Sequence, residues 1–280
     1  MVLTVVNVVG TSKVAFCICK TLFANSEFEP GFVVSRDIQR ANWFVKNLRC
    51  GLPTTYEELS ELSGIVFVAV PDAVIERVFS KIKPRMTGRV CVFHFSGFLS
   101  SSIFDVDDLD WGRGSIHPNM SFSDIDVALK SMERCFFGIE GNDYGMTVAR
   151  KIVNSISEKF IELDESSKTA YHLAAVIASN FVTGLSHLAE RLYSEYKIDR
   201  FRDIIPQLIR QTAENISKVG SVKALTGPVS RGDWNVVEKE GQIFKQNFTE
   251  YSQLYDVMID ILREMVYESN RKENKRNGGF

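Results

Sequence analysis

The sequence is short of the features that mark a secreted, metal-binding or nucleic-acid-binding protein. Its five cysteines form no CxxC pair, which argues against both a disulfide framework and a zinc site. A net charge of -2 provides no global positive field for nucleic acid. The apolar N-terminus has no basic region before it and is interrupted by Gly10, so no signal peptide is expected. We therefore expect a cytoplasmic protein with reduced thiols, no metal and no nucleic-acid partner.

A long uncharged stretch raises the question of a membrane span. No Lys, Arg, Asp or Glu lies between residues 171 and 189. The stretch nevertheless carries His172, Ser179 and Asn180, and such side chains are costly in the middle of a bilayer. We interpret it as a buried helix in a soluble protein and expect no membrane partner.

The first half of the chain alternates strand and helix patterns. Apolar runs predict strands at 3–9, 31–34, 64–70 and 90–95, with helical spacing at 13–24, 37–47 and 73–81. Further short strands are expected at 115–117, 134–139 and 159–163. Near-continuous apolar strands alternating with helices are typical of a parallel sheet covered on both faces. The predicted fold class is α/β, with an N-terminal doubly wound Rossmann sheet and an all-α C-terminal domain.

The pattern becomes helical after about residue 164. Helices are predicted at 166–196, 201–219, 233–247 and 248–269. The expected domains are therefore a nucleotide-binding domain, 1–164, and an all-helical substrate and dimerisation domain, 165–270. The interrupted basic run at the end predicts a disordered tail over 271–280.

The first strand runs into a turn that resembles a phosphate-binding loop. It consists of Gly10, Thr11, Ser12, Lys13 and Val14, and a helix follows. A glycine permits the tight turn, and the helix N-terminus offers free N–H groups to a diphosphate. Ser12 replaces the usual middle glycine. An ordinary strand–turn–helix is the alternative interpretation.

Residues after the second strand favour NADP over NAD. An NAD enzyme usually carries an acidic residue here, which accepts a hydrogen bond from the ribose 2′-OH. This chain has Ser35 and Arg36, with Arg40 one turn later, and a guanidinium can pair with a 2′-phosphate. Asp37 complicates this interpretation, because it can accept from a 2′-OH or repel a phosphate. Alternatively, the two arginines simply begin a solvated helix.

Ligands of open α/β sheets bind beyond the carboxyl ends of the strands. Val70, Pro71 and Asp72 end one predicted strand, and Ser96 and Gly97 follow another, so we expect both to line the nicotinamide side. His94 lies within its strand and is interpreted as a packed residue.

His117 follows the next strand at a sharp turn. A histidine there can act as an acid or base near neutral pH, or serve only as a turn residue.

The first long helix of the second half has a polar face. Lys168, His172, Ala175, Ser179 and Asn180 recur at roughly helical spacing. This face is a candidate for catalysis or substrate binding. An amphipathic bundle helix with satisfied polar groups is the alternative.

A second anionic site is conceivable near residues 226–233. The amides that open the following helix, with Arg231, can bind an anionic group. Asp233 can equally be a plain N-cap. In a dimer, this segment would complete the partner's cleft.

These motifs together resemble a group of bacterial Rossmann proteins with a C-terminal helical domain of unknown function. The segments that carry the resemblance are Gly10–Ala15, Val70–Asp72, His94–Gly97, Ser115–Asn119, Lys168–Ala175, Ala178–Asn180 and Leu225–Asp233. The group is similar to the 6-phosphogluconate dehydrogenase-like proteins, which include ketopantoate reductase and pyrroline-5-carboxylate reductase.

The resemblance implies NADP as cofactor and a homodimer formed through the helical domain. In the related hydroxyacid dehydrogenases, a lysine on such a helix, with asparagine one turn later, protonates or orients the substrate oxygen. Lys168 is similar in place, but His172 stands where the asparagine would be, and Asn180 lies two turns further on.

We therefore expect an NADP-dependent oxidoreductase. It would transfer a hydride between NADP(H) and a small carbonyl- or imine-type substrate held between the domains. Lys168 or His172 would exchange the proton, and Asn180 would orient the substrate. The alternative is a non-catalytic NADP-binding protein that senses redox state or binds a partner, which Ser12 and the incomplete Lys–Asn pair favour.

Overall fold

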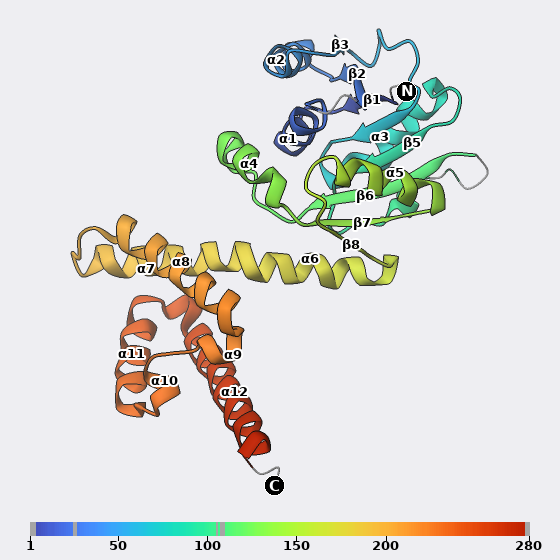
Figure 1. The fold of residues 1–280 in the computed structure, drawn as a ribbon. Coiled ribbons are helices and arrows are strands. Elements are labelled where there is room, and N and C mark those ends of the chain that lie inside the picture. The colour runs from blue at the N-terminus through green and yellow to red at the C-terminus, as the bar shows by residue number, and fades with distance from the viewer. Residues whose placement is uncertain (1–3, 25–26, 105, 107–109, 278–280) are drawn as a thin grey trace. The chain divides into compact units, whose positions relative to one another are not determined.

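The computed structural model describes residues 4–24, 27–104, 106 and 110–277. The chain folds as two units, Met1–Asn180 and Phe181–Phe280. The first unit carries the sheet, drawn from blue to yellow-green in Figure 1. The division lies inside the long helical segment rather than at residue 164, because the first turns of that segment pack against the strands.

The sheet has eight strands in the order β3-β2-β1-β4-β5-β6-β7-β8. Their bounds are β1 Thr4–Val9, β2 Phe28–Val34, β3 Leu52–Thr54, β4 Ile65–Val68, β5 Cys91–His94, β6 Gly112–Pro118, β7 Phe137–Gly141 and β8 Phe160–Glu162. The first six strands have the order of a dinucleotide-binding Rossmann sheet, so the predicted fold class is confirmed.

One neighbouring pair departs from the expected parallel arrangement. β7 pairs antiparallel with β6, with Ser115 opposite Glu140 and Ile116 opposite Ile139. The other pairs in the sheet are parallel. Hydrophobic periodicity reports which face a side chain takes and not the direction of the strand, so the sequence could not show this reversal.

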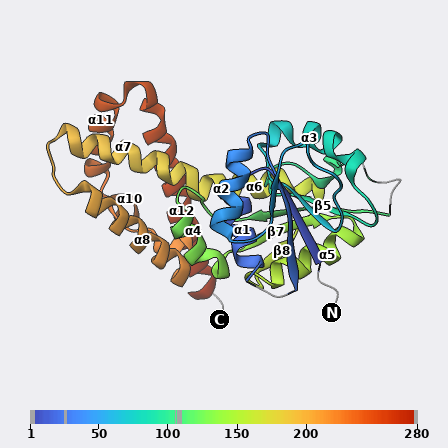
Figure 2. The same cartoon turned by 90° about the horizontal axis from the view of Figure 1, so that it is seen from above.

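Helices cover both faces of the sheet (Figure 2). Those sharing one apolar cluster are α1 Lys13–Leu22, α2 Ile38–Leu48, α4 Ile125–Ser131 and α5 Asp143–Asn154. α3, Ile75–Ile82, packs on the opposite face. Burial on both faces explains why β4 and β5 are uninterrupted runs of buried residues.

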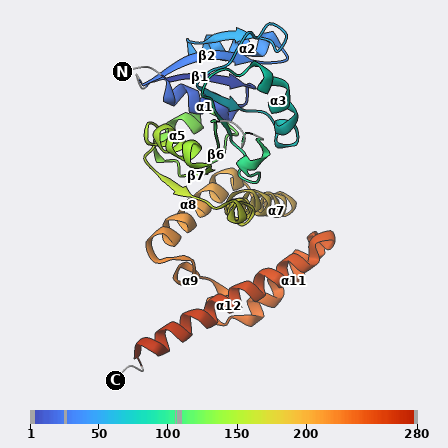
Figure 3. The ribbon, with the colours of Figure 1, turned by 90° about the vertical axis from the view of Figure 1, so that its right-hand side faces the viewer.

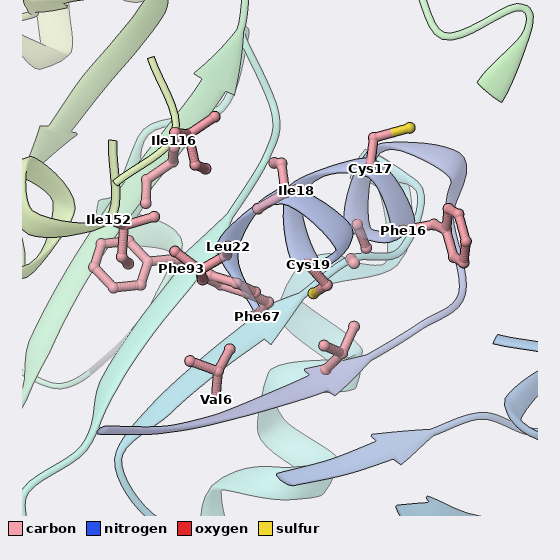
Figure 4. Close-up of a cluster of buried hydrophobic side chains, with 14 of the residues drawn as sticks. Val6, Phe16, Cys17, Ile18, Cys19, Leu22, Phe67, Phe93, Ile116 and Ile152 are labelled. Carbon is pink, nitrogen blue, oxygen red and sulfur yellow. The ribbon is translucent and has the colours of Figure 1, made fainter. Parts of the chain in front are cut away.

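The packing of α1 follows from its sequence. Ser12 caps the helix, and most of its apolar residues become buried, among them Phe16, Ile18 and Leu22. Figure 4 shows Ile18 and Leu22 beside Phe67 and Phe93 of the sheet. This contact holds the start of α1, and with it the turn after β1, at the carboxyl edge of the strands.

The long helical segment begins as α6, Lys168–Val176, and passes through a π turn at Ile177–Phe181. By length and composition, the helix Glu165–Glu195 could cross a membrane. Lys168, in its first turn, is buried against the strands and hydrogen-bonded to the Ser96 carbonyl. None of residues 171–189 is buried in the structure, so the expectation of a buried helix is wrong for this stretch.

The second unit is helical (Figure 3). Its helices are α7 Val182–Glu195, α8 Phe201–Val219, α9 Ser221–Ala224, α10 Pro228–Arg231, α11 Trp234–Asn247 and α12 Ser252–Asn277. The expected disordered tail is wrong for residues 271–277, because α12 continues through them, and residues 278–280 lie outside the described chain. Among the described residues of this unit, the buried hydrophobic side chains are Ile205, Val229, Val237 and Phe248.

Candidate cofactor and catalytic site

The turn after β1 brings two stretches of backbone into close approach. Gly10 has a φ of 109°, a conformation that favours glycine. A Cβ atom there would lie 2.3 Å from the Ala69 carbonyl oxygen at the end of β4. The Gly10 N–H donates to the Val34 carbonyl at 2.8 Å. A side chain at residue 10 would therefore clash with the backbone at the end of β4.

Ser12 takes the place of a second glycine without strain. Its backbone is extended, with φ -71° and ψ 154°, and its Oγ accepts a hydrogen bond from the Ala15 N–H at 3.2 Å. The first-turn amides, those of Lys13 and Val14 included, have no acceptor within the helix. Together with the helix dipole, they suit this end of α1 to an anion.

The side chain of Lys13 is directed elsewhere. Its Nζ donates to the Ser123 carbonyl oxygen at 2.5 Å, in the connection between β6 and α4. At this position the loop therefore offers a phosphate a backbone amide rather than an ammonium group. Thr11 is half-buried beside it.

Of the residues after β2, some stabilise the start of α2 and others are exposed to solvent. Asp37 is the N-cap of α2 and accepts from the Gln39 N–H at 2.9 Å, while Arg40 Nε lies 4.0 Å from its carboxylate. Ser35 is buried, and its Oγ accepts from the Asp37 N–H at 3.2 Å. One carboxylate oxygen of Asp37 thus caps α2, and Arg36 is exposed beside it.

The ends of β4 and β5 are joined by side chains. Ser96 Oγ donates to Asp72 Oδ2 at 2.6 Å and accepts from the N–H groups of Phe98 and Leu99, at 3.1 and 2.9 Å. Asp72 follows Val70 and Pro71 after β4. The turn that contains Gly97 is thereby fixed beside the point where the strand order reverses, which is where such sheets bind ligands.

His94 is a packed residue, as its place in the strand predicts. It is fully buried, and its Nδ1 accepts from the Ser96 N–H at 3.2 Å. Its Nε2 lies 3.3 Å from the Ser100 carbonyl and therefore carries the proton. Burial lowers the pKa of His94 to about 3, so the ring is neutral.

Lys168 enters the sheet unit from the first turn of α6. Its side chain is 1% exposed, and its Nζ donates to the Ser96 carbonyl at 3.2 Å and, over a short distance, to Ser115 Oγ. Glu140 Oε2 lies 3.9 Å away. Burial lowers the pKa of Lys168 to about 8, although the negative charges of Glu140 and Asp72 oppose that fall.

His172 lies one turn beyond Lys168 and faces Gly97. A Cβ on Gly97 would lie 2.6 Å from His172 Nδ1 and 2.8 Å from His117 Nε2, so glycine makes room for both rings. The two rings are perpendicular, with centroids 5.6 Å apart. Among the described residues, His172 Nδ1 is a buried side-chain nitrogen without a hydrogen-bond partner.

His117 also contacts Tyr171. Its Nδ1 lies 3.3 Å from the Tyr171 hydroxyl, and the rings meet edge to face. Burial lowers the pKa of His117 to about 4, helped by the charges of His172 and Lys168, so the imidazole is neutral at pH 7. Burial also raises the pKa of Tyr171 to about 12. The pair therefore presents neutral hydrogen-bonding groups rather than a charge.

Two other expected sites look different in the structure. Asn180 is exposed in the π turn, and its Oδ1 accepts a hydrogen bond from Ser179, outside the cluster around Gly97. Asp233 lies at the N-cap position of α11, but its carboxylate pairs with Arg231 Nε at 2.9 Å instead of capping the helix.

Three members of the cluster were not among the expected site residues: Ser115, Glu140 and Tyr171. Glu140 carried the one available signal, an acidic residue directly after a predicted apolar strand. Ser115 and Tyr171 lie inside segments that carried the resemblance, and neither has a spacing that distinguishes it from a structural residue.

Comparison with known proteins finds relatives that cover most of the chain. Residues 135–260 match the domain of unknown function DUF2520. The crystal structure of protein TM1727 from Thermotoga maritima is 37% identical, with 95% of this chain and 99% of that chain covered and a TM-score of 0.78. A comparison with curated proteins gave no match.

Two more distant structures share the fold. Protein BF3122 from Bacteroides fragilis, provisionally assigned as an NADP oxidoreductase, is 20% identical over 94% of this chain and 98% of its own, with a TM-score of 0.77. An imine reductase from Myxococcus stipitatus in complex with NADP+ is 13% identical, with 94% of both chains covered and a TM-score of 0.63.

Proposed function

Because the chain belongs to the same family as TM1727 and its residues 135–260 match the DUF2520 domain, we propose that it is an NADP-dependent oxidoreductase acting on a small carbonyl- or imine-type substrate. The observation that carries the proposal is the meeting of Lys168, His117 and His172 around the Ser96–Gly97 turn. Similarity of fold to BF3122, provisionally assigned as an NADP oxidoreductase, and to an imine reductase with bound NADP+ supports it.

The residues around the first turn fit a dinucleotide. At Gly10, a Cβ would fill the cradle against Ala69, and the amide-bearing start of α1 lies next to it. Arg36 is exposed beyond the end of β2, where a 2′-phosphate would be recognised. These groups would hold NADP(H), whose nicotinamide supplies or accepts the hydride.

The proton is the protein's part of the reaction. Reduction of a carbonyl or imine needs one proton on the oxygen or nitrogen as the hydride reaches carbon. Either Lys168 or His172 would exchange it. The N–H groups of Lys168 are directed at the Ser96 carbonyl, Ser115 and Glu140, whereas His172 Nδ1 has no partner. We therefore favour His172 as the exchanging group, with Lys168 supplying positive charge beside it.

The test is oxidation of NADPH in the presence of a panel of small ketones, aldehydes and cyclic imines. We expect turnover with one class that falls about 100-fold in His172→Ala, the usual size of a general-acid effect. Exposed Ser121→Ala serves as the control. Tight NADPH binding without turnover on any substrate would favour the non-catalytic alternative.

Cofactor preference is tested separately by calorimetry. Arg36→Ala is expected to weaken NADPH binding by about 10- to 100-fold, the value of a charge-assisted hydrogen bond, and to leave NADH binding unchanged. Arg77→Ala, an exposed arginine on α3, is the matched control. Equal losses for both nucleotides in Arg36→Ala would contradict NADP specificity.

We also propose a homodimer through the helical unit. α8 leaves Leu208, Ile209, Ile216 and Val219 exposed, while this unit buries few apolar side chains of its own. Such an uncovered apolar face suits an interface between copies. Ile216→Glu should convert dimer to monomer in light scattering, and Ser217→Glu, which points about 100° away on the helix, should not. A monomeric native protein would refute the proposal.

A further inference from the structure

Glu140 and Lys168 form a buried ion pair behind the proposed proton-exchange site. Their side chains are 7% and 1% exposed, and Glu140 Oε2 lies 3.9 Å from Lys168 Nζ. Removing two charges from water is costly unless the remaining polar atoms are also satisfied. Stability alone therefore does not explain why the fold buries this ion pair.

The carboxylate of Glu140 is fully engaged by the protein. Oε1 accepts from Ser101 Oγ at 2.6 Å, and Oε2 accepts from the Ser101 N–H at 2.9 Å and from Ser115 Oγ at 3.4 Å. Ser115 is also the near partner of Lys168 Nζ. The position of the carboxylate is thus set by β6, β7 and the Ser100–Ser101 turn, and it offers a fixed negative charge to the start of α6.

Two successive turns of α6 meet two successive residues of the turn after β5. Lys168 contacts the carbonyl of Ser96, and His172, four residues later, faces Gly97. Residues four apart lie on the same side of a helix, so anchoring the first fixes the second. The hydrogen bond from the Lys168 ammonium to the Ser96 carbonyl therefore determines where the His172 ring lies.

We propose that Glu140 is a positioning residue that holds the Lys168 ammonium on the Ser96 carbonyl and so keeps His172 against Gly97 and His117. This inference rests on the proposed function only for its effect on catalysis. Its structural part concerns the charge of Lys168 and the placement of the His172 ring, and both can be measured without any substrate.

Other ionisable groups also face Lys168, and they must be separated from Glu140. Asp72 adds negative charge from the end of β4, while His94 on β5 and His117 on β6 are neutral neighbours. Among the described residues, Glu140 is the acidic group within ion-pair distance of the Lys168 ammonium. Its removal should therefore have the largest effect on the titration of that ammonium.

The decisive variant is Glu140→Gln, which keeps the shape and the oxygen acceptor and removes the charge. Titration of the ¹⁵N-labelled Lys168 ammonium by NMR is expected to show a midpoint lower by about one pH unit or more than in the native protein. Glu162→Gln, which breaks an exposed pair with Arg150, should leave the midpoint unchanged. In Glu140→Asp, which keeps the negative charge, the Lys168 midpoint should lie between those of Glu140→Gln and the native protein.

His172 provides the second readout. Its ring-proton chemical shifts should move in Glu140→Gln and stay in place in Glu162→Gln, because only the first variant releases the anchor on Ser96. In turnover assays, Glu140→Gln should lower kcat and shift its pH profile by the same amount as the ammonium midpoint, with KM little changed. Failure to find any substrate would remove the kinetic measurement and leave both NMR measurements valid.

The outcomes are distinguishable. An unchanged Lys168 midpoint, or unchanged His172 resonances, in folded Glu140→Gln would overturn the proposal. If that variant does not fold, Glu140→Gln combined with Lys168→Met removes both charges and should fold, since no charge is then buried alone. A double variant with native His172 resonances would overturn the proposal as well.

Discussion

A methyl group on Gly97 should act as a wedge between the two histidines. Its Cβ would lie 2.6 Å from His172 Nδ1 and 2.8 Å from His117 Nε2, well inside van der Waals contact. The backbone at Gly97 has no left-handed strain, so Gly97→Ala changes packing and nothing else. Both rings are largely enclosed, and they must rotate or move to admit the methyl group.

The size of the effect follows from overpacking. Inserting one carbon into a packed site costs about 1–3 kcal/mol. Part of this is recovered if the ring of His172 turns, because its Nδ1 loses no hydrogen bond on moving. We expect the free energy of unfolding to fall by an amount at the lower end of that range. Turnover should also fall, because the displaced ring is the proposed proton exchanger.

Urea denaturation of four proteins measures the contact: native, Gly97→Ala, His172→Ala, and the double variant. In the His172→Ala background the clash with His172 is gone and the one with His117 Nε2 remains, so adding the methyl group should cost clearly less than in the native protein. Identical costs in the two backgrounds would refute the packing argument and place the effect of the methyl group elsewhere.

Three further outcomes are expected. Unfolding free energy should fall as pH drops from about 6.5 to 4, since His117 titrates near 6.5 when unfolded and its lowered pKa favours the neutral ring in the fold; the part due to His117 approaches about 3 kcal/mol and is absent in His117→Gln, whereas the lowered pKa of His94 still contributes a loss of its own. Gly10→Ala should abolish NADPH binding and lower Tm, as calorimetry and thermal melts would show. Phe67→Ala, a cavity in the sheet core, should cost about 3–5 kcal/mol with NADPH affinity preserved.

Much of the first unit was predictable because its strands are buried on both faces. The runs around Phe67 and Phe93 are apolar and alternate with helical segments, which is typical of such a sheet. β3 was missed because it is three residues long and contains Pro53. α5 was missed because Gly145 and β-branched residues weaken its helical signal.

The site residues that are close in sequence could be grouped in advance, and those that only the fold brings together could not. Lys168 and His172 could be paired from sequence because a four-residue spacing fixes their common face. Glu140 could not be joined to Lys168, since β7 and α6 meet only through the fold of the sheet. The sequence left the role of His117 open between acid or base and turn residue. Its neutral state could not be predicted, because it depends on burial against Tyr171 and His172.

Because β7 runs antiparallel to β6, the register between these two strands determines which β7 side chain faces Lys168. With β7 antiparallel to β6, Glu140 lies opposite Ser115, and Ile139 points to the other face of the sheet. A slip of β7 by one residue along β6 would exchange the two. Lys168 would then meet a hydrocarbon side chain instead of a carboxylate, so the pairing of two strands determines whether the catalytic edge carries a balanced charge.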